Sequence, residues 1–307
     1  MVFTLNNPKW INADLLKAHK VSDVSYQFIN ELKRRIHDST SNEPKVSVCI
    51  SAWNEELNII RCLDSLSRSV TNIPFEVIVV NNNSTDKTQQ ILDELGVTNY
   101  FQAVQGCGVS RQLAQEKAKG EYILLADADC YYPRNWLDKM YQSLMKDNVA
   151  VVYSRHSFLG NKNIKRWQYF LYELGKDFII ELRNIKRPYL NTYGMSMGFR
   201  RTHGLKEGFV TKNIRGEDGR MCFDLMKYGK VKLVRSKKAR VWTSDRNLEK
   251  DGSIMKAIQK RVLRELLRMR NYFSTPEPHD TKTSENTEKS SEEYKKTIKS
   301  KLKMNKK

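Results

Sequence analysis

Two hydrophobic patterns alternate along residues 44–250: short continuous apolar runs, and stretches whose apolar residues recur at helical spacing. Continuous runs are typical of strands buried on both faces, and apolar residues three or four apart are typical of amphipathic helices. The pattern predicts an α/β fold with a mostly parallel sheet flanked by helices. We expect strands at residues 46–50, 75–80, 100–104 and 122–127, and helices at residues 54–68, 84–95 and 109–119.

The pattern becomes less regular after residue 130. It predicts helices at residues 134–145, 164–181 and 216–228, strands at residues 149–153 and 192–200, and a last strand ending at Trp242. Ser84 is a candidate cap for the helix at residues 84–95. Trp136, Trp167 and Tyr193 fit either the core or a binding surface on which a ligand ring stacks.

Both ends of the chain differ from this pattern. We expect residues 1–43 to form a peripheral helical extension. Residues 275–307 are rich in Thr, Ser, Glu and Lys, a composition that predicts a disordered tail. Residues 251–274 predict a basic amphipathic helix, which either packs on the domain or lies on an anionic membrane surface. Its apolar stripe consists of Ile254, Ile258, Val262, Leu266 and Met269.

The net charge of +19 is carried mainly by the body of the chain, because residues 275–307 hold 9 Lys against 6 Asp or Glu. An anionic partner and a lysine-rich composition both account for it. We expect a soluble, cytoplasmic protein with reduced thiols. The five cysteines include no C-x-x-C pair, and the sequence shows neither an apolar run of about 18 residues nor a secretory leader.

Polar segments follow three predicted strands: Ala52-Trp53-Asn54, Asn81-Asn82-Asn83 and Asp127-Ala128-Asp129. Parallel strands end at the same edge of a sheet, and ligands bind there, so we expect these segments to share one cleft. Asp127 and Asp129 could place two carboxylates on one hard cation, although a D-x-D triplet is also common in solvated loops.

The chain resembles family 2 glycosyltransferases of the GT-A fold over roughly residues 45–245. The resemblance rests on residues 46–56, 77–86 and 120–129, in that order and spacing, and on Tyr193-Gly194-Met195-Ser196 and Gly216-Glu217-Asp218 farther on. It implies a GT-A domain over residues 44–250, with a nucleotide-binding half at residues 44–130 and an acceptor half at residues 131–250.

The resemblance implies a metal-dependent transfer of a sugar from a nucleotide-diphosphate sugar to an acceptor hydroxyl, with inversion at the anomeric carbon. Asp127 and Asp129 would bind Mg²⁺ or Mn²⁺ on the diphosphate. Asp218 would be the general base, and Glu217 would orient the acceptor or a neighbouring group.

The resemblance also implies nucleotide contacts. Ala52, Trp53, Glu55 and Asn81 would border the base and ribose. The family usually has Asp where Asn81 stands, and an amide both donates and accepts, so the choice between a UDP- and a GDP-sugar stays open. Arg111, also explicable as a surface residue, and Arg246 would contact the diphosphate.

The expected acceptor is a glycan or a lipid-linked glycan, and the expected location is the cytoplasm or the inner face of a membrane. A basic nucleic-acid-binding protein is the alternative from another class, but acids where phosphates would lie and the lack of an aromatic and basic RNA-binding motif argue against it. A non-catalytic sugar-nucleotide binder is less consistent with the presence of Asp127, Asp129 and Asp218 together.

Overall fold

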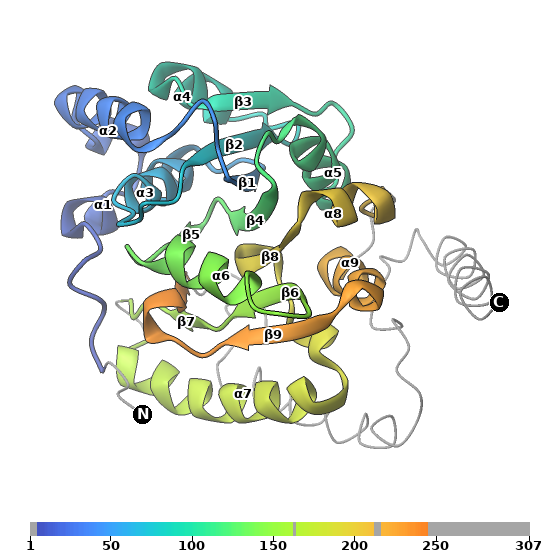
Figure 1. Ribbon diagram of the computed structural model, residues 1–307. Helices are drawn as coiled ribbons and strands as arrows, with labels where there is room; N and C mark the ends of the chain where they lie inside the picture. Colours follow the sequence, from blue (N-terminus) through green and yellow to red (C-terminus); the bar gives the residue numbers. More distant parts are fainter. Residues whose placement is uncertain (1–4, 162–163, 212–215, 245–307) are drawn as a thin grey trace.

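The computed structural model describes residues 5–161, 164–211 and 216–244 (Figure 1). The predicted amphipathic helix at residues 251–274, the predicted tail at residues 275–307 and Arg246 lie outside these ranges.

A seven-stranded sheet forms the centre, in the order β3-β2-β1-β4-β8-β6-β9 (Figure 1). Neighbouring strands are parallel except at β8, which is antiparallel to β4 and β6. The predicted α/β class with a mostly parallel sheet is therefore confirmed. The strands are β1 Val46–Ala52, β2 Phe75–Asn81, β3 Thr98–Phe101, β4 Tyr122–Asp127, β6 Val149–Ser154, β8 Met197–Arg200 and β9 Lys230–Val234.

A small second sheet adjoins the large one, in the order β5-β10-β7. Its strands are β5 Cys130–Tyr131, β10 Val241–Thr243 and β7 His156–Phe158. The sequence pattern does not predict β5 or β7, because two or three residues are too few to show an alternation of apolar and polar positions. Its first strand, β5, follows the Asp127-Ala128-Asp129 turn directly, so this turn lies between the two sheets in the sequence.

Helices cover both faces of the large sheet. Apolar side chains of α2, α3, α4 and α6 form one core with one face, and those of α5 and α9 form a second core with the other. Burial on both faces explains why the strands are continuous apolar runs. The helices are α1 Ala13–Lys17, α2 Tyr26–Ser39, α3 Glu56–Leu66, α4 Thr88–Leu95, α5 Cys107–Lys117, α6 Trp136–Leu144, α7 Arg166–Lys186, α8 Arg201–Glu207 and α9 Glu217–Leu225.

The N-terminal extension is helical and packs directly on the first core. Leu32 of α2 has no exposed surface, and Leu15 of α1 belongs to the same cluster. Arg61 of α3 donates hydrogen bonds to the carbonyl oxygens of Leu15 and Ala18, at 3.0 and 2.7 Å. Within the described residues, the extension is thus joined to the sheet domain by apolar and polar contacts.

Candidate active site

The three polar segments lie together at the carboxyl edge of the large sheet. The strand register places Ala52 beside Asn81 and Ser51 beside Asp127. Three neighbouring parallel strands therefore end at one edge, where open α/β sheets bind ligands.

The loops after β1 and β2 are tied together by reciprocal hydrogen bonds. The Asn54 N–H donates to Ser84 Oγ at 2.9 Å, and the Thr85 N–H donates to Asn54 Oδ1 at 2.8 Å. Ser84 therefore links two loops and does not cap a helix, which corrects the prediction, since α4 begins only at Thr88. The connection leaves Trp53 52% exposed beside buried Ala52. Such an indole can stack on a nucleotide base.

The amide of Asn81 is fully buried and engaged by the protein. Its Nδ2 donates to Gln89 Oε1 at 2.8 Å, and its Oδ1 accepts from the Ser84 N–H at 3.0 Å. The neighbouring Asn82, for which the sequence predicted no role of its own, accepts from the Gly106 N–H at 2.8 Å. Asn82 thereby positions the start of α5, the helix that carries Arg111.

Glu55 lies at the start of α3, next to the same loops. Its N–H donates to Thr88 Oγ1 at 2.9 Å, and its carboxylate accepts from Asn58 Nδ2 at 2.6 Å. Glu55 thus helps to shape the edge of the sheet near Trp53.

The Arg111 guanidinium joins acids from two elements that are far apart in the sequence. Its Nη2 lies 3.1 Å from Asp127 Oδ1, and its Nη1 lies 2.7 Å from Glu217 Oε1 and also pairs with Asp218. The Arg111 side chain is only 6% exposed. The acids of both predicted motifs therefore face one another across one buried cation. In this arrangement Arg111 binds carboxylates, whereas the sequence placed it at the diphosphate.

The two acids of α9 occupy its first turn. Gly216, the residue before the helix, has a φ of 98°, a conformation that favours glycine. Asp218 Oδ2 accepts from the Gly194 N–H at 2.7 Å. A Cβ on Gly194 would lie 1.8 Å from Arg111 Nη2, so only a residue without a side chain lets the backbone come this close.

Burial perturbs two acids of this cluster. Desolvation raises the pKa of Asp218 to about 7, although Arg111 opposes the shift. Desolvation likewise raises the pKa of Asp127 to about 6, again against the effect of Arg111. A carboxylate with a pKa near neutrality is suited to accept a proton during catalysis.

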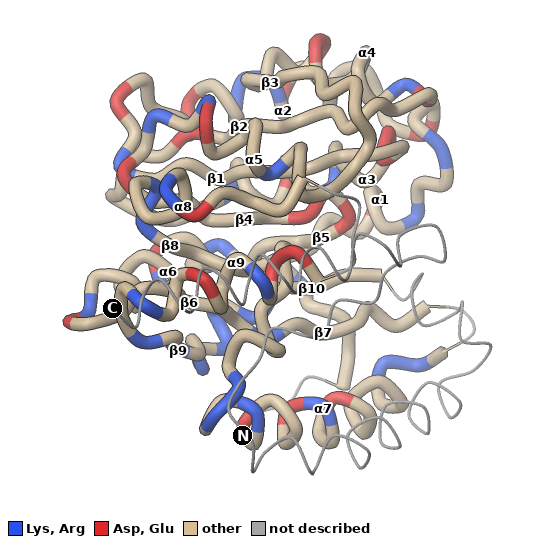
Figure 2. The backbone as a smooth tube through the Cα atoms, turned by 90° about the vertical axis from the view of Figure 1, so that its right-hand side faces the viewer, with Lys and Arg blue, Asp and Glu red and all other residues tan. Residues whose placement is uncertain are grey.

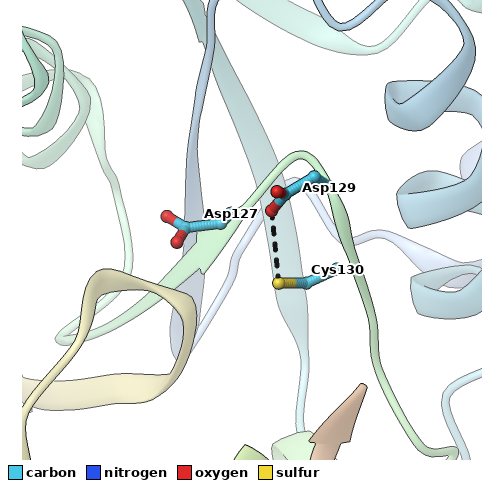
Figure 3. A group of neighbouring side chains, drawn as sticks. All are labelled: Asp127, Asp129 and Cys130. Atoms are coloured by element: carbon cyan, nitrogen blue, oxygen red, sulfur yellow. Dashed lines mark hydrogen bonds between the residues drawn. The ribbon is translucent and has the colours of Figure 1, made fainter. Parts of the chain in front are cut away.

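The turn after β4 carries a group of three potential metal ligands (Figure 3). The ligand atoms of Asp127, Asp129 and Cys130 all lie within 4.8 Å of one another. Burial raises the pKa of the Cys130 thiol well above its ordinary value, and Cys130 Sγ donates to Asp129 Oδ1 at 3.4 Å. The thiol therefore supports a carboxylate and is not itself a ligand for a hard cation. The two carboxylates fit Mg²⁺ or Mn²⁺, which bind oxygen.

Tyr132 connects this turn to the segment before β8, a role that the sequence did not reveal. Its hydroxyl accepts from the Asp127 N–H at 2.8 Å and donates to the Met195 carbonyl oxygen at 3.0 Å. The ring is buried. Tyr132 thus positions Asp127 relative to the segment that contains Gly194.

The three candidate stacking residues lie in different environments. Trp136 is buried in the core and donates from Nε1 to Ser196 Oγ at 2.9 Å. Tyr193, which precedes Gly194, is 41% exposed and packs edge-on against His156. Trp167 is exposed on α7. Among the three, only Tyr193 is next to a residue that contacts Asp218.

The sequence is similar to known glycosyltransferases. The model of glycosyl transferase family 2 matches residues 47–204, more than half of the chain. The putative glycosyltransferase EpsH of Bacillus subtilis (strain 168) is 32% identical over 114 residues, which cover 36% of this chain and 33% of that protein. The poly(ribitol-phosphate) beta-N-acetylglucosaminyltransferase TarS of Staphylococcus aureus (strain Mu50 / ATCC 700699) is 32% identical over 120 residues, which cover 37% of this chain and 20% of TarS.

The fold is similar to a solved structure as well. The crystal structure of S. aureus TarS 1-349 superimposes with a TM-score of 0.50 at 19% identity, over 66% of this chain and 60% of that chain. At this identity the likeness concerns the fold alone. The chain spans no more than about half the length of the curated relatives it matches.

Proposed function

Because the chain belongs to glycosyl transferase family 2, we propose that it transfers a sugar from a nucleotide-diphosphate sugar to an acceptor hydroxyl, with inversion at the anomeric carbon. One observation carries this proposal: Arg111 brings Asp127 of β4 and Asp218 of α9 to the same guanidinium. A carboxylate for the donor side and a carboxylate for the acceptor side then flank one site.

Asp218 is the proposed general base. Its raised pKa, about 7, lets the carboxylate accept the proton of the acceptor hydroxyl as that oxygen attacks the anomeric carbon. The Gly194 N–H and Arg111 both contact Asp218, so its position is set from two sides. A single base and no enzyme nucleophile lead to inversion, because the acceptor attacks opposite the leaving group. Glu217, beside it on Arg111, is proposed to orient the acceptor or a neighbouring group.

Asp127 and Asp129 are the proposed ligands of Mg²⁺ or Mn²⁺. The bound cation would neutralise negative charge on the diphosphate leaving group. Asp127 is positioned for this role by the Tyr132 hydroxyl, and Asp129 by the Cys130 thiol.

The donor is proposed to be a UDP- or GDP-sugar, bordered by Ala52, Trp53, Glu55 and Asn81. The exposed indole of Trp53 supports stacking on the base. Both hydrogen-bonding ends of the Asn81 side chain already have protein partners, so Asn81 shapes this region more than it selects between bases. Arg246 remains a proposed contact to the diphosphate, as does Arg111, which would then share its guanidinium between phosphate and acids.

The acceptor is proposed to be a cell-surface or lipid-linked glycan. The name of TarS, a transferase that acts on poly(ribitol-phosphate), supports an acceptor of this class. We keep the cytoplasm or the inner face of a membrane as the proposed location. Among the described residues, no helix combines the length and the apolar character needed to cross a bilayer.

The proposal is tested with a panel of UDP- and GDP-sugars in the presence of Mn²⁺ or Mg²⁺, with release of nucleotide diphosphate as the measurement. We expect release with at least one donor, and its loss in both Asp218→Asn and Asp129→Ala. Asp218→Asn should retain donor binding in a thermal-shift assay, because Asp218 lies on the acceptor side. Donor binding that is lost with Asp218→Asn, or full metal-independent activity of Asp129→Ala, would contradict the assigned roles.

A further inference from the structure

The face of α7 that packs on the protein carries buried charged residues beside apolar ones. Glu173 is fully buried and accepts from Ser157 Oγ at 3.0 Å and from the Phe158 N–H at 2.8 Å. Asp177 is buried and pairs with Arg155 and Arg240. These contacts attach α7 to β7 and to the segment before β10.

The opposite face of α7 is apolar and exposed. Six large apolar side chains recur three or four residues apart, so they form one stripe along the helix. The stripe is exposed by between 36% and 76% at each position. We call it the α7 stripe; it consists of Trp167, Leu171, Leu174, Phe178, Leu182 and Ile185. Figures 1 and 2 both show α7 at the margin of the molecule, beyond β7 and β9.

Rotation of α7 cannot bury this stripe without a large cost. Turning the helix would separate Glu173 and Asp177 from their partners and leave buried charges unpaired, which is strongly destabilising. The ion pair between Arg166 and Glu173, at 2.7 Å, would turn away from β7 together with them. A continuous apolar surface of this kind on a globular protein marks an interaction site.

The chain leaves the described region beside the start of α7. The guanidinium of Arg166, the first residue of α7, lies 4.9 Å from the centre of the Trp242 ring in β10. The Leu159 N–H donates to the Thr243 carbonyl oxygen at 2.9 Å. The segment that follows Ser244 therefore starts next to one end of the α7 stripe.

The sequence of that segment matches the α7 stripe in length and pattern. Residues 252–273 contain an apolar stripe of their own, which we call the C-terminal stripe: Ile254, Ile258, Val262, Leu266 and Met269. As a helix, these 22 residues would span about 33 Å, and the 21 residues of α7 span about 31 Å. Residues 245–251 can bridge up to about 25 Å when extended, enough to turn the chain back onto α7.

We propose that residues 252–273 form an amphipathic helix that packs its C-terminal stripe against the α7 stripe of the same chain. The basic residues of the segment, such as Lys260 and Arg264, would then face water. Intramolecular docking has the advantage that the short connection keeps the two stripes at high effective concentration.

Site-specific photo-cross-linking in the full-length chain tests this arrangement. A benzoylphenylalanine replaces Val262 in one variant and Lys260, on the opposite side of the same predicted helix, in the control variant. After irradiation and proteolysis, mass spectrometry should find Val262 joined to peptides of residues 166–186, and the Lys260 variant should lack this product. Adding Phe178→Glu should abolish the product, whereas Lys186→Glu, exposed and outside the stripe, should leave it unchanged.

Cross-linking in a mixture of ¹⁴N- and ¹⁵N-labelled protein distinguishes contacts within one chain from contacts between two copies of the chain. Cross-links that join labelled to unlabelled chains would show a second copy on the stripe and would overturn the proposal. Equal yields from the Val262 and Lys260 variants, or no cross-link to α7 at all, would also overturn it. So would flotation with phosphatidylglycerol vesicles that Phe178→Glu abolishes, because the stripe would then contact lipid.

Discussion

One guanidinium cannot neutralise three carboxylates, so the cluster around Arg111 keeps negative charge whenever its acids are ionised. Asp127, Glu217 and Asp218 all contact Arg111, and the side chains of Glu217 and Asp218 are nearly buried. Desolvation is the main cause of the raised pKa of Asp127 and of Asp218, and repulsion from the neighbouring carboxylates raises both values further. The excess charge makes Arg111 the residue on which the arrangement of the site depends.

We predict that Arg111→Met lowers the free energy of unfolding by about 3–5 kcal/mol at pH 8, because it leaves buried acids unpaired. The loss should be smaller at pH 5, where the acids can bind protons instead. Urea denaturation at both pH values measures the effect. Arg134→Met, at an exposed arginine, serves as the control and should change the stability by no more than about 0.5 kcal/mol. An equal loss at the two pH values would contradict this electrostatic explanation.

The sequence identified the acids of the site and Arg111 as site residues, but it did not show that Arg111 pairs with Asp127, Glu217 and Asp218. Motif spacing pointed to Asp127, Asp129, Glu217 and Asp218, yet Arg111 lies 16, 106 and 107 residues from its three partners. Such pairing depends on tertiary packing, which no local pattern records. The roles of Asn82 and Tyr132 were not predicted for the same reason, because Asn82 accepts from the Gly106 N–H, 24 residues away, and Tyr132 donates to the Met195 carbonyl oxygen, 63 residues away.

At the scale of elements, α5 is positioned by a close approach to the segment after α8. A Cβ on Gly108 would lie 1.9 Å from the Val210 carbonyl oxygen, so α5 could not keep its place with any other residue there. Arg111 lies one turn farther along the same helix. The placement of the guanidinium therefore depends on a glycine near the start of α5.

We predict that Gly108→Ala destabilises the protein by about 1–3 kcal/mol, because the added carbon forces α5 away from its neighbour. Activity should fall as well, since Arg111 moves with the helix. Gly175→Ala is the matched control: it also adds one carbon to a helix, but apart from its chain neighbours and the backbone of its own helix, no atom lies within 4 Å of the added carbon. This control should stabilise the protein by about 0.5–1 kcal/mol. Urea denaturation that gives the same sign for both variants would refute the packing argument.

Long elements with a clear hydrophobic period could be predicted, and short or inverted ones could not. The strands β1, β2 and β4 are continuous apolar runs and were found within two residues of their bounds. β9 was not predicted, although Lys230-Val231-Lys232-Leu233 alternates between polar and apolar residues as a half-buried strand does. The sequence correctly predicts a helix at α7 but does not show that its buried face contains ion pairs, because their partners Arg155 and Arg240 lie on other segments.

At the scale of the whole molecule, the perturbed acids link stability to pH. The pKa of Asp218 is raised from 3.8 to about 7, so the folded chain retains a proton that the unfolded chain has already lost. Stability from this group is fully present below about pH 4 and is lost as the pH rises toward 7. Asp127 contributes in the same direction over a window that ends near pH 6.

We predict that the unfolding free energy of Asp218→Asn, relative to that of the unmodified protein, rises between pH 5 and pH 7 and then levels off. The amide has no proton to lose, so the variant lacks this part of the pH dependence. The slope should not exceed about 1.4 kcal/mol per pH unit, the limit for one proton. Chemical denaturation at several pH values gives the difference directly, and a difference that stays constant with pH would show that Asp218 has an ordinary pKa.

The contact between Gly194 and Arg111 has a consequence for how related sequences can diverge. A side chain at position 194 would occupy the space of the Arg111 guanidinium, so a substitution at one position changes what is tolerated at the other. Related sequences that have arginine at position 111 should have glycine at position 194. Related sequences with another residue at position 111 should tolerate larger residues at position 194. The two halves of the domain are therefore expected to have evolved under a shared constraint at this pair.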